Sequence, residues 1–401
     1  MDKILISAFS CNPNKGSESL NGWCWSNTLA HKEFEVFVLT RSIEKNDIEK
    51  KANLKNLNFY YISLPFGLEK MYHFSQPTMY LYYILWQWKA YKIAKKLTTN
   101  NHFHRVHHIS WGSIQQGSFL YKLGIPFIFG PAGGGQEAPP SFKSYFKEHW
   151  KSEIKRKIFG RILFLLNPGC KKMLKSAFAV LVSNKDTLLL AKKAGSKNIG
   201  VTLDAALPTT FFPPYFIERN LKNENLKLLW VGRFLPRKGL LLVLEVMKKI
   251  RTSPNISLTI VGDGEMRKYV SEKIDEYGLQ ETVKWIGSVP FESVKEYYKS
   301  HDAFFFTSLR DSCPAQLIEA MAYGLPIITI DLHGQSEIVT DNTGIKVPLT
   351  TPEKVVNDLA QAIVNLSKDE IKYKKLSIGA YNFACNQTWD LKINKIVSEY
   401  Y

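Results

Sequence analysis

Residues 303–331 read AFFFTSLRDSCPAQLIEAMAYGLPIITID and contain one complete strand–helix–strand unit. The apolar runs AFFFTS and PIITID at its two ends predict buried strands. QLIEAMA between them is a run of good helix formers, with Pro314 suited to its first turn and Gly324 to its left-handed end. Such a crossover joins parallel strands. The stretch therefore predicts a parallel α/β sheet.

The same alternation of strands and helices runs through both halves of the chain. In the first half, strands are predicted at residues 3–9, 34–40, 59–65, 105–110, 125–131 and 178–184. In the second half, they are predicted at residues 226–233, 257–264, 283–287, 303–308 and 326–331. A helix is expected to open near Gly22. We therefore predict two doubly wound parallel sheets with a boundary near residues 206–214, and ligand sites beyond the carboxyl ends of the strands, in a cleft between the domains.

Length and composition fit a globular protein. The 401 residues suggest two domains, and a hydrophobic content of 45% is ordinary. The first apolar run, after Lys3, is too short for a secretory signal, and no run of 18 apolar residues predicts a transmembrane helix. The five scattered cysteines show no zinc-binding spacing, and their odd number argues against a disulfide framework. We therefore expect a reducing cytoplasm.

The net charge of +17 lies almost wholly in the first half of the chain. Residues 1–220 hold 30 Lys and Arg against 14 Asp and Glu, and the remainder holds 23 against 22. Such an excess favours an anionic partner, which could be lipid, nucleic acid or an acidic substrate. No motif for RNA or DNA binding is visible, so we do not expect nucleic acid.

Two segments of the basic half combine aromatic and charged residues. Segment 143–175 mixes lysines and arginines with large apolar side chains, which predicts contact with an anionic membrane surface or a lipid-linked acceptor. The alternative is that its aromatics are core and its lysines are solvated. Segment 71–92 is rich in Tyr and Trp, and we expect it to be mainly core.

Arg233 and Lys238 in WVGRFLPRKG stand at the end of a predicted strand. A guanidinium fork and a lysine point charge there could clamp a diphosphate, and Gly232 would let the ligand approach the backbone. The alternative is a pair of solvated surface charges. Gly264 in VGDG is a weaker signal, since a tight turn accounts for it equally well.

Two carboxylates flank the start of the helix in residues 303–331. Asp311 lies beside backbone N–H groups at the helix start, a place suited to an anionic or hydroxyl-rich ligand. Glu319 lies more than a turn inside, where it could reach ligand hydroxyls. The alternative is that Asp311 only caps the helix and Glu319 makes a surface ion pair. The residues alone leave both interpretations open.

Taken together, these motifs resemble the retaining GT-B glycosyltransferases of family 4. Asp311 and Glu319 are similar to the family's E-x7-E motif. Further matches are GRFLPRKG to G-R-L-x-x-x-K-G, VGDG to V-G-x-G, and GQSEIV at 334–339 to G-G-x-x-E-I-V. The resemblance covers residues 226–350. It is looser in the first half, where it rests on KGSESLNGW (15–23), VHHISWG (106–112), FGPAGGGQEAP (129–139) and SNKDT (183–187).

The resemblance implies a GT-B fold of two Rossmann-like domains facing a central cleft. Residues 1–222 would form the acceptor-side domain with a basic, membrane-facing surface. Residues 223–385 would bind the donor, and a helix at 386–401 would pack back on the first domain. The implied activity is transfer of a sugar, with retention, from a UDP- or GDP-sugar to a glycan or lipid-linked acceptor in polysaccharide or glycolipid biosynthesis. The implied location is the cytoplasmic face of the plasma membrane.

The resemblance also implies roles for individual residues. Arg233 and Lys238 would neutralise the leaving diphosphate, Asp311 would hold sugar hydroxyls and Glu319 the ribose. His107 or His108, on opposite faces of one strand, would orient the donor sugar or acceptor. The other donor-binding residues would be Gly16, Gly232, Gly264, Ser312, Cys313, Pro314 and Ala315. The acceptor-side residues would be Ser17, Glu18, Gly133, Gly134 and Gly135. No D-x-D motif is seen, so neither a metal nor another cofactor is expected.

Two departures from the family pattern fall at the sugar position. Asp311 is one methylene shorter than the family's glutamate, and SCP replaces its G-F-G. The shorter acid implies an altered choice of donor sugar or a loss of activity. Two alternatives to a glycosyltransferase stay open: another GT-B nucleotide-sugar enzyme, such as an epimerase or phosphorylase, and a catalytically silent GT-B module that binds carbohydrate or lipid. The matches at Arg233, Lys238 and Glu319 argue against silence.

Overall fold

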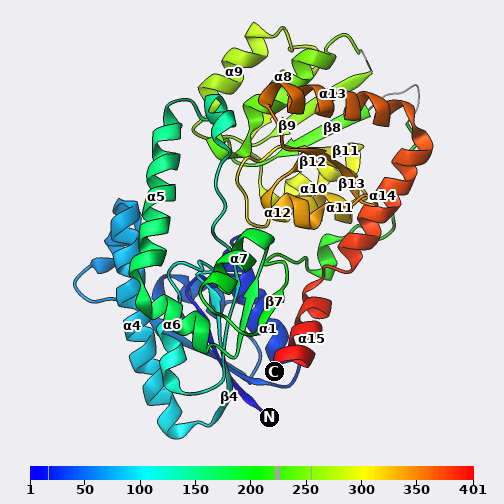
Figure 1. Cartoon of the computed structure of the whole chain (residues 1–401). Coiled ribbons are helices and arrows are strands. Elements are labelled where there is room, and N and C mark those ends of the chain that lie inside the picture. Colours follow the sequence, from blue (N-terminus) through cyan, green and yellow to red (C-terminus); the bar gives the residue numbers. More distant parts are fainter. Residues whose placement is uncertain (17, 222–225, 254) are drawn as a thin grey trace. The chain divides into compact units, whose positions relative to one another are not determined.

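The computed structural model describes residues 1–16, 18–221, 226–253 and 255–401. The chain divides into two compact units, each with one parallel sheet (Figure 1). Unit 1 comprises Met1–Gly135, Gly160–Ala206 and Trp389–Tyr401, and unit 2 comprises Gln136–Phe159 and Leu207–Thr388. The prediction of two doubly wound α/β domains is confirmed.

The sheet of unit 1 has seven parallel strands in the order β3-β2-β1-β4-β5-β6-β7. They are β1 (Lys3–Ala8), β2 (Glu35–Arg41), β3 (Leu57–Ile62), β4 (Phe103–Ser110), β5 (Phe127–Ala132), β6 (Ala179–Val182) and β7 (Ile199–Val201). All six predicted strands are present. The prediction missed β7, because three half-exposed residues at a sheet edge carry no apolar run.

The sheet of unit 2 has six parallel strands in the order β10-β9-β8-β11-β12-β13. They are β8 (Leu226–Val231), β9 (Ile256–Val261), β10 (Val283–Gly287), β11 (Ala303–Phe306), β12 (Ile327–Asp331) and β13 (Gly344–Pro348). The five predicted strands are confirmed. The prediction missed the edge strand β13, whose sequence GIKVP has a glycine, a lysine and a proline among five residues.

Helices connect the strands of each sheet. Unit 1 contains α1 (Glu18–His31), α2 (Lys45–Glu49), α3 (Met71–Phe74), α4 (Gln76–Asn100), α6 (Pro168–Ser176), α7 (Lys185–Lys193) and α15 (Trp389–Tyr400). Unit 2 contains α8 (Leu240–Ile250), α9 (Arg267–Glu276), α10 (Phe291–Ser300), α11 (Ala315–Ala322), α12 (His333–Ile338), α13 (Pro352–Lys368) and α14 (Glu370–Cys385). Helix α5 (Trp150–Leu166) belongs to unit 2 up to Phe159 and to unit 1 from Gly160.

Helix α1 begins at Glu18, a turn earlier than predicted. Gly22 lies inside the helix because a Cβ atom there would stand 2.1 Å from the carbonyl oxygen of Ser10. The glycine therefore marks a close approach of α1 to the loop after β1, and not the start of the helix.

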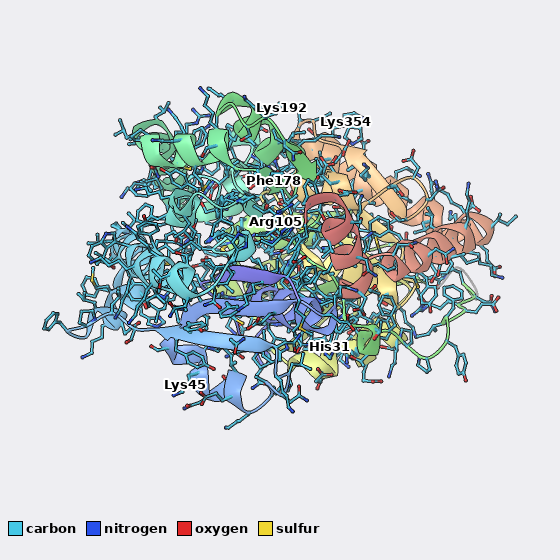
Figure 2. All side chains as sticks on the ribbon, turned by 90° about the horizontal axis from the view of Figure 1, so that it is seen from below. His31, Lys45, Arg105, Phe178, Lys192 and Lys354 are labelled. Carbon is cyan, nitrogen blue, oxygen red and sulfur yellow. The ribbon has the colours of Figure 1, made fainter. Side chains whose placement is uncertain are left out.

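The strand β1 is buried on both faces, which explains its unbroken apolar sequence. Ile4 and Ile6 pack in one apolar layer with α1 and α15, and Leu5 packs in the other with α4. Figure 1 shows α15 beside α1. The last turn of α15 is also held by polar contacts, since Arg105 Nε donates to the carbonyl of Tyr400 at 2.9 Å. The Arg105 guanidinium lies over the ring of Phe178 at 4.9 Å (Figure 2).

The first division of the chain, after Ala206, agrees with the boundary that the strand pattern predicts near residues 206–214. The bounds implied by the resemblance, 222/223 and 385/386, differ from the observed divisions after Ala206 and after Thr388. Residues 222–225 lie outside the described residues. The segment Gln136–Phe159, here called the arm, belongs to unit 2 although it falls within the predicted first domain. Phe142, Tyr145 and Phe146 of the arm are buried in the core of unit 2, which is the physical reason for this assignment.

Gly239 holds the end of β11 close to the loop after β8. It has a φ of +67°, and a Cβ atom there would lie 2.2 Å from the carbonyl oxygen of Thr307. We expect Gly239→Ala to lower the free energy of unfolding by about 3 kcal/mol or more, because strain and a backbone clash add. Gly278, with a φ of +61° and no atom near its Cβ position, is the matched control. Gly278→Ala should cost only about 1 kcal/mol in the same urea titration. Equal losses of stability in the two variants would show that the close approach of Gly239 to Thr307 adds no further cost.

Candidate active site

Lys238 and Asp311 form the centre of the polar site in unit 2. Lys238 follows β8 in a single turn, Pro236–Lys238, and Asp311 follows β11. Lys238 Nζ lies 2.5 Å from Asp311 Oδ2, and Arg237 Nη1 lies 3.1 Å from the same oxygen. The side chains of Lys238 and Asp311 are 7% and 14% exposed. The predicted strand-end cation and the acid at the helix start therefore form a buried ion pair.

Burial and charge act against each other in this pair. Burial would raise the pKa of Asp311, but Lys238 and then Arg237 outweigh it and hold that pKa below its ordinary value. Burial lowers the pKa of Lys238, and Asp311 only partly offsets this. Ser308 also donates to Asp311 Oδ2, at 3.4 Å. All of these contacts use Oδ2, and none of them uses Oδ1.

Glu319 lies on α11 in a different environment. Its Oε2 accepts a hydrogen bond from the Tyr298 hydroxyl at 2.9 Å. Burial raises the pKa of Glu319 to about 7, while Tyr298 and Lys238 act in the opposite direction. The surface ion pair considered above is not found among the described residues. Asp311 does not cap α11 either. The N-cap residue of α11 is Pro314, and no side chain that the structure describes makes a capping hydrogen bond at the start of this helix.

Arg233 and the neighbouring glycines lie at the end of β8. Arg233 is exposed, and its side chain makes no ion pair or hydrogen bond within the described residues. A Cβ atom on Gly264 would meet the backbone of Phe234 at 2.9 Å. The amide of Gly232 donates to the carbonyl of Val261 at 3.0 Å. The tight packing of these two loops thus accounts for Gly264, whereas the Arg233 side chain extends into solvent.

The loop Ser312–Cys313–Pro314 that replaces G-F-G packs on α12. The amide of Gly334 donates to the carbonyl of Asp311 at 3.1 Å, and a Cβ atom on Gly334 would lie 2.0 Å from the carbonyl oxygen of Ser312. Ala315 is the first residue of α11. The backbone of this loop is therefore fixed by α12.

The predicted acceptor-side residues meet at the carboxyl edge of the sheet of unit 1. Glu18 Oε1 accepts from the amide of Gly112 at 2.8 Å, and the amide of Gly133 donates to the carbonyl of Gly112 at 2.7 Å. Gly134 and Gly135 follow with φ values of +131° and +90°. Gly16 has open space around its Cβ position, and Ser17 lies outside the described residues. The loops after β1, β4 and β5 thus come together.

His107 and His108 are fully buried on opposite faces of β4, as alternation predicts. His107 contacts the Tyr401 hydroxyl through Nδ1 and the carbonyl of Gly130 through Nε2, each at 2.6 Å. His108 Nδ1 lies 3.0 Å from Ser7 Oγ. Burial lowers the pKa of His107 to about 3 and that of His108 to about 4, so both rings are neutral. Each ring therefore has protein partners and no exposed surface.

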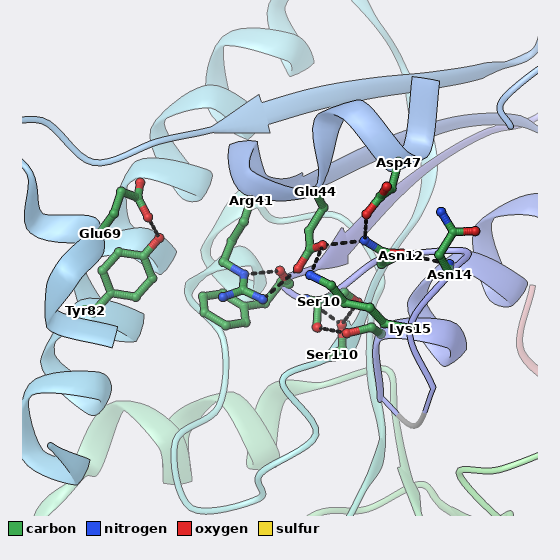
Figure 3. Close-up of polar contacts among 12 residues, drawn as sticks. Ser10, Asn12, Asn14, Lys15, Arg41, Glu44, Asp47, Glu69, Tyr82 and Ser110 are labelled. Carbon is green, nitrogen blue, oxygen red and sulfur yellow. Dashed lines mark hydrogen bonds and ion pairs between the residues drawn. The ribbon is translucent and has the colours of Figure 1, made fainter. Parts of the chain in front are cut away.

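A buried polar cluster at the ends of β1 and β2 was not predicted (Figure 3). Glu44 Oε2 accepts from Asn12 Nδ2 at 2.6 Å and pairs with Lys15 at 2.9 Å. Arg41 pairs with Glu44 Oε1 at 3.0 Å and lies over the Phe9 ring at 4.5 Å. This cluster attaches Asn12 and Lys15, in the loop after β1, to Glu44 after β2. Its only sequence signal is the run of polar residues after the two strands.

Neither a membrane-spanning helix nor a metal-binding group occurs in the part of the chain that the structure describes. Within residues 1–16, 18–221, 226–253 and 255–401, every helix is too short or too polar to cross a membrane. Over the same ranges, no three His, Cys, Asp or Glu side chains are grouped to hold a metal ion.

The model of the family described as glycosyl transferases group 1 matches residues 213–383. Residues 213–383 are therefore similar to that family. They contain Arg233, Lys238, Asp311 and Glu319, so the polar site of unit 2 lies inside the matched region.

A curated relative supports this assignment. The amylovoran biosynthesis glycosyltransferase AmsD of Erwinia amylovora is 34% identical over 140 residues, 35% of this chain and 39% of that protein. The match spans about half the length or less of this and other curated relatives.

Solved structures show the fold of the whole chain. Sucrose-phosphate synthase from Thermosynechococcus elongatus has a TM-score of 0.67 at 18% identity and covers 100% of this chain and 98% of its own. Anabaena HepE in complex with UDP has a TM-score of 0.61 at 14% identity, covering 99% and 100%. The chain has the GT-B fold, as the sequence motifs predicted.

The raised pKa of Glu319 gives a pH-dependent test of its burial. A carboxyl whose pKa is raised by folding is most favourable when protonated, so its contribution to stability is complete below pH 4.5 and is lost as the pH rises through about 7. Glu319→Gln should therefore match the wild type at pH 5 and exceed its free energy of unfolding at pH 8 by roughly 2 kcal/mol. Glu296→Gln, at an exposed glutamate paired with Lys299, is the control and should show no such difference. A Glu319→Gln curve parallel to the wild type would contradict the buried carboxyl.

Proposed function

We propose that this chain is a retaining glycosyltransferase of family 4 that moves a sugar from a UDP- or GDP-sugar to a glycan or lipid-linked acceptor. The observation that carries the proposal is the Lys238–Asp311 ion pair after β8 and β11, at the carboxyl edge where such sheets bind ligands, with Glu319 near enough for its charge to act on Lys238. HepE, which shares the fold, is described in complexes with UDP and UDP-glucose. AmsD is described as a glycosyltransferase of amylovoran biosynthesis, which supports glycosyl transfer in a biosynthetic reaction.

In this proposal, cations of unit 2 stabilise the leaving diphosphate. Lys238 is held in place by Asp311, and the exposed Arg233 is available to a ligand. Fixed positive charge aimed at the negative charge that develops on a leaving group often makes the greatest single contribution to catalysis. No carboxylate is required as a covalent nucleophile, because a donor phosphate oxygen would take the acceptor proton on the same face. We propose no catalytic metal and no other cofactor.

The two acids would bind different parts of the donor. Asp311 Oδ2 is occupied by Lys238 and Arg237, so Oδ1 would accept from the sugar hydroxyls. Glu319 would bind the ribose hydroxyls. Burial disfavours the ionised form of its carboxyl, and hydrogen bonds from these hydroxyls would stabilise that form. Gly232 and Gly264, with residues 312–315, would line the donor. Gly16 would also contact the donor, whereas Glu18 and the Gly133–Gly135 loop would face the acceptor.

His107 and His108 would act through the backbone of unit 1. Both rings are buried and bonded to protein groups. We propose that they fix the end of β4, which leads to Gly112 and its contact with Glu18. Their contribution to orienting the substrates would therefore be indirect.

Loss of one cation or one acid of the site should lower the rate of transfer strongly. A thermal-shift screen against UDP-, GDP- and ADP-sugars first identifies the donor, because a ligand of the folded state raises the melting temperature. With that donor, Lys238→Ala and Glu319→Ala should each lower kcat/KM by about 100-fold or more. Lys354→Ala, an exposed lysine at the start of α13, is the control and should keep full activity (Figure 2).

The outcomes of these assays separate the alternatives. Wild-type transfer in both site variants would refute the assignment of the site. A donor-induced thermal shift without turnover would favour a silent GT-B module. Conversion of the donor without an acceptor, to an epimer or to a sugar phosphate, would favour an epimerase or phosphorylase.

We also propose that the enzyme works at the cytoplasmic face of an anionic membrane, through segment 143–175. Helix α5 in this segment exposes the apolar side chains of Ile154, Ile158 and Ile162. Its exposed lysines, Lys151 and Lys155, lie on the same helix. A helix with exposed apolar and basic residues is suited to the interface of an anionic bilayer.

Vesicle sedimentation can compare the exposed apolar residues of α5 with those of a second helix, α4. Helix α4 lies in the segment expected to be mainly core, but it also exposes Leu81, Ile84 and Trp88. We expect the triple serine variant of Ile154, Ile158 and Ile162 to lower binding to phosphatidylglycerol vesicles about tenfold or more, since three apolar side chains lose their burial in lipid. The triple serine variant of the three α4 residues is the comparison, and phosphatidylcholine vesicles are the charge control. If only the α4 variant lost vesicle binding, the membrane contact would lie on α4 and not on α5. If the wild type bound no vesicles, the proposed membrane contact would be refuted.

A further inference from the structure

The arm Gln136–Phe159 is attached to unit 2 at several points. Tyr145 donates to Glu245 at 2.6 Å, and Tyr269 donates to Glu148 of the arm at 2.5 Å. His333 Nε2 lies 2.9 Å from the carbonyl oxygen of Glu137. Together with the buried aromatic residues of the arm, these contacts fix the first half of α5 on unit 2.

Glu153 is the one acid on α5, and it is buried. Its Oε1 lies 2.8 Å from Arg310 Nε and 2.7 Å from Arg156 Nη2, and its side chain is 9% exposed. Burial would raise the pKa of Glu153, but Arg156 and Arg310 outweigh it and hold that pKa below its ordinary value. Burial in turn lowers the pKa of Arg310 to about 10. Glu153 is therefore an ionised, buried counterion of Arg310.

Arg310 connects this pair to the donor site. It directly precedes Asp311, and its carbonyl oxygen accepts from Arg237 Nη1 at 3.0 Å. The same Nη1 atom lies 3.1 Å from Asp311 Oδ2, which also binds Lys238. A continuous polar network thus runs from α5, in the first half of the sequence, to the acid nearest the proposed donor sugar. Glu153 thus holds the Arg310 side chain, and Arg237 binds the Arg310 carbonyl oxygen.

We propose that Glu153 is a positioning residue for the donor site. By fixing Arg310, it sets the backbone of the loop that carries Asp311 and thereby the Lys238–Asp311 pair. This inference rests on the proposed glycosyl transfer, which it deepens. It assigns to the arm a contribution to the part of the donor site that lies in residues 213–383.

The test compares Glu153 with a contact that only attaches the arm. Glu153→Gln removes the charge that holds Arg310, whereas Tyr145→Phe removes the hydrogen bond to Glu245. We expect Glu153→Gln to lower kcat/KM for the donor about tenfold or more, because a small displacement of a charged group is costly in catalysis. The KM of the acceptor should stay unchanged. Glu153→Asp should restore part of the loss, and Tyr145→Phe should leave the kinetics near wild type.

A double-mutant cycle shows whether Glu153 acts through Arg310. If it does, Glu153→Gln combined with Arg310→Gln should lose no more activity than the more damaging single variant. Additive losses, or full activity of Glu153→Gln, would overturn the proposal. Equal losses in Glu153→Gln and Tyr145→Phe would also overturn it, since docking of the arm would then explain both.

Hydrogen exchange provides a measurement that needs no substrate. Deuterium uptake in peptides covering residues 307–315 should rise in Glu153→Gln and stay at the wild-type level in Tyr145→Phe. Unchanged uptake in Glu153→Gln would contradict the positioning role. A wild type that binds and turns over no nucleotide sugar would refute the proposed function, while the exchange data would still decide whether Glu153 fixes the loop.

Discussion

The ion pair between Lys238 and Asp311 is the interaction on which the candidate site of unit 2 depends. It joins the loop after β8 to the loop after β11, and these strands are neighbours in the sheet. Withdrawing a lysine and a carboxylate from water costs several kcal/mol for each ion, so such a pair persists only with close geometry and further partners. Arg237 and Ser308 supply those partners at the same carboxylate oxygen. The two loops are therefore held in one arrangement before any ligand binds.

The two acids of the E-x7-E pattern differ because their neighbours differ. Asp311 has two cations within 3.1 Å, and its pKa is lowered. Glu319 has the Tyr298 hydroxyl as its hydrogen-bond partner, and burial raises its pKa to about 7. Asp311 is thus charged and already paired, whereas Glu319 has a carboxylate that gains from any ligand able to donate hydrogen bonds to it. This difference supports distinct roles on the donor, with Glu319 the better suited to a diol such as ribose.

The sequence predicts those features of the fold and of the candidate site that leave a pattern in neighbouring residues. The apolar runs identify eleven strands, because strands covered on both faces are continuously hydrophobic. β7 and β13 lack such runs. Lys238, Asp311 and Glu319 could be proposed for the candidate site because they stand at strand ends and in the helix that follows. The pairing of Glu153 with Arg310 was not found, because an ion pair between residues so distant in sequence has no local signature. The assignment of the arm to unit 2 was missed for the same reason.

The charges around Asp311 favour an anionic ligand at this place in unit 2. The polar network contains four cations and two carboxylates, namely Arg156, Arg237, Lys238, Arg310, Glu153 and Asp311. It therefore carries an excess of two positive charges in surroundings where Lys238 and Glu153 are nearly inaccessible to water. Such an excess costs free energy unless an anion approaches, and exposed Arg233 adds a further positive charge at the end of β8. The diphosphate of a nucleotide sugar would supply the missing negative charge, so the network that holds Asp311 in place also favours the leaving group of the proposed reaction.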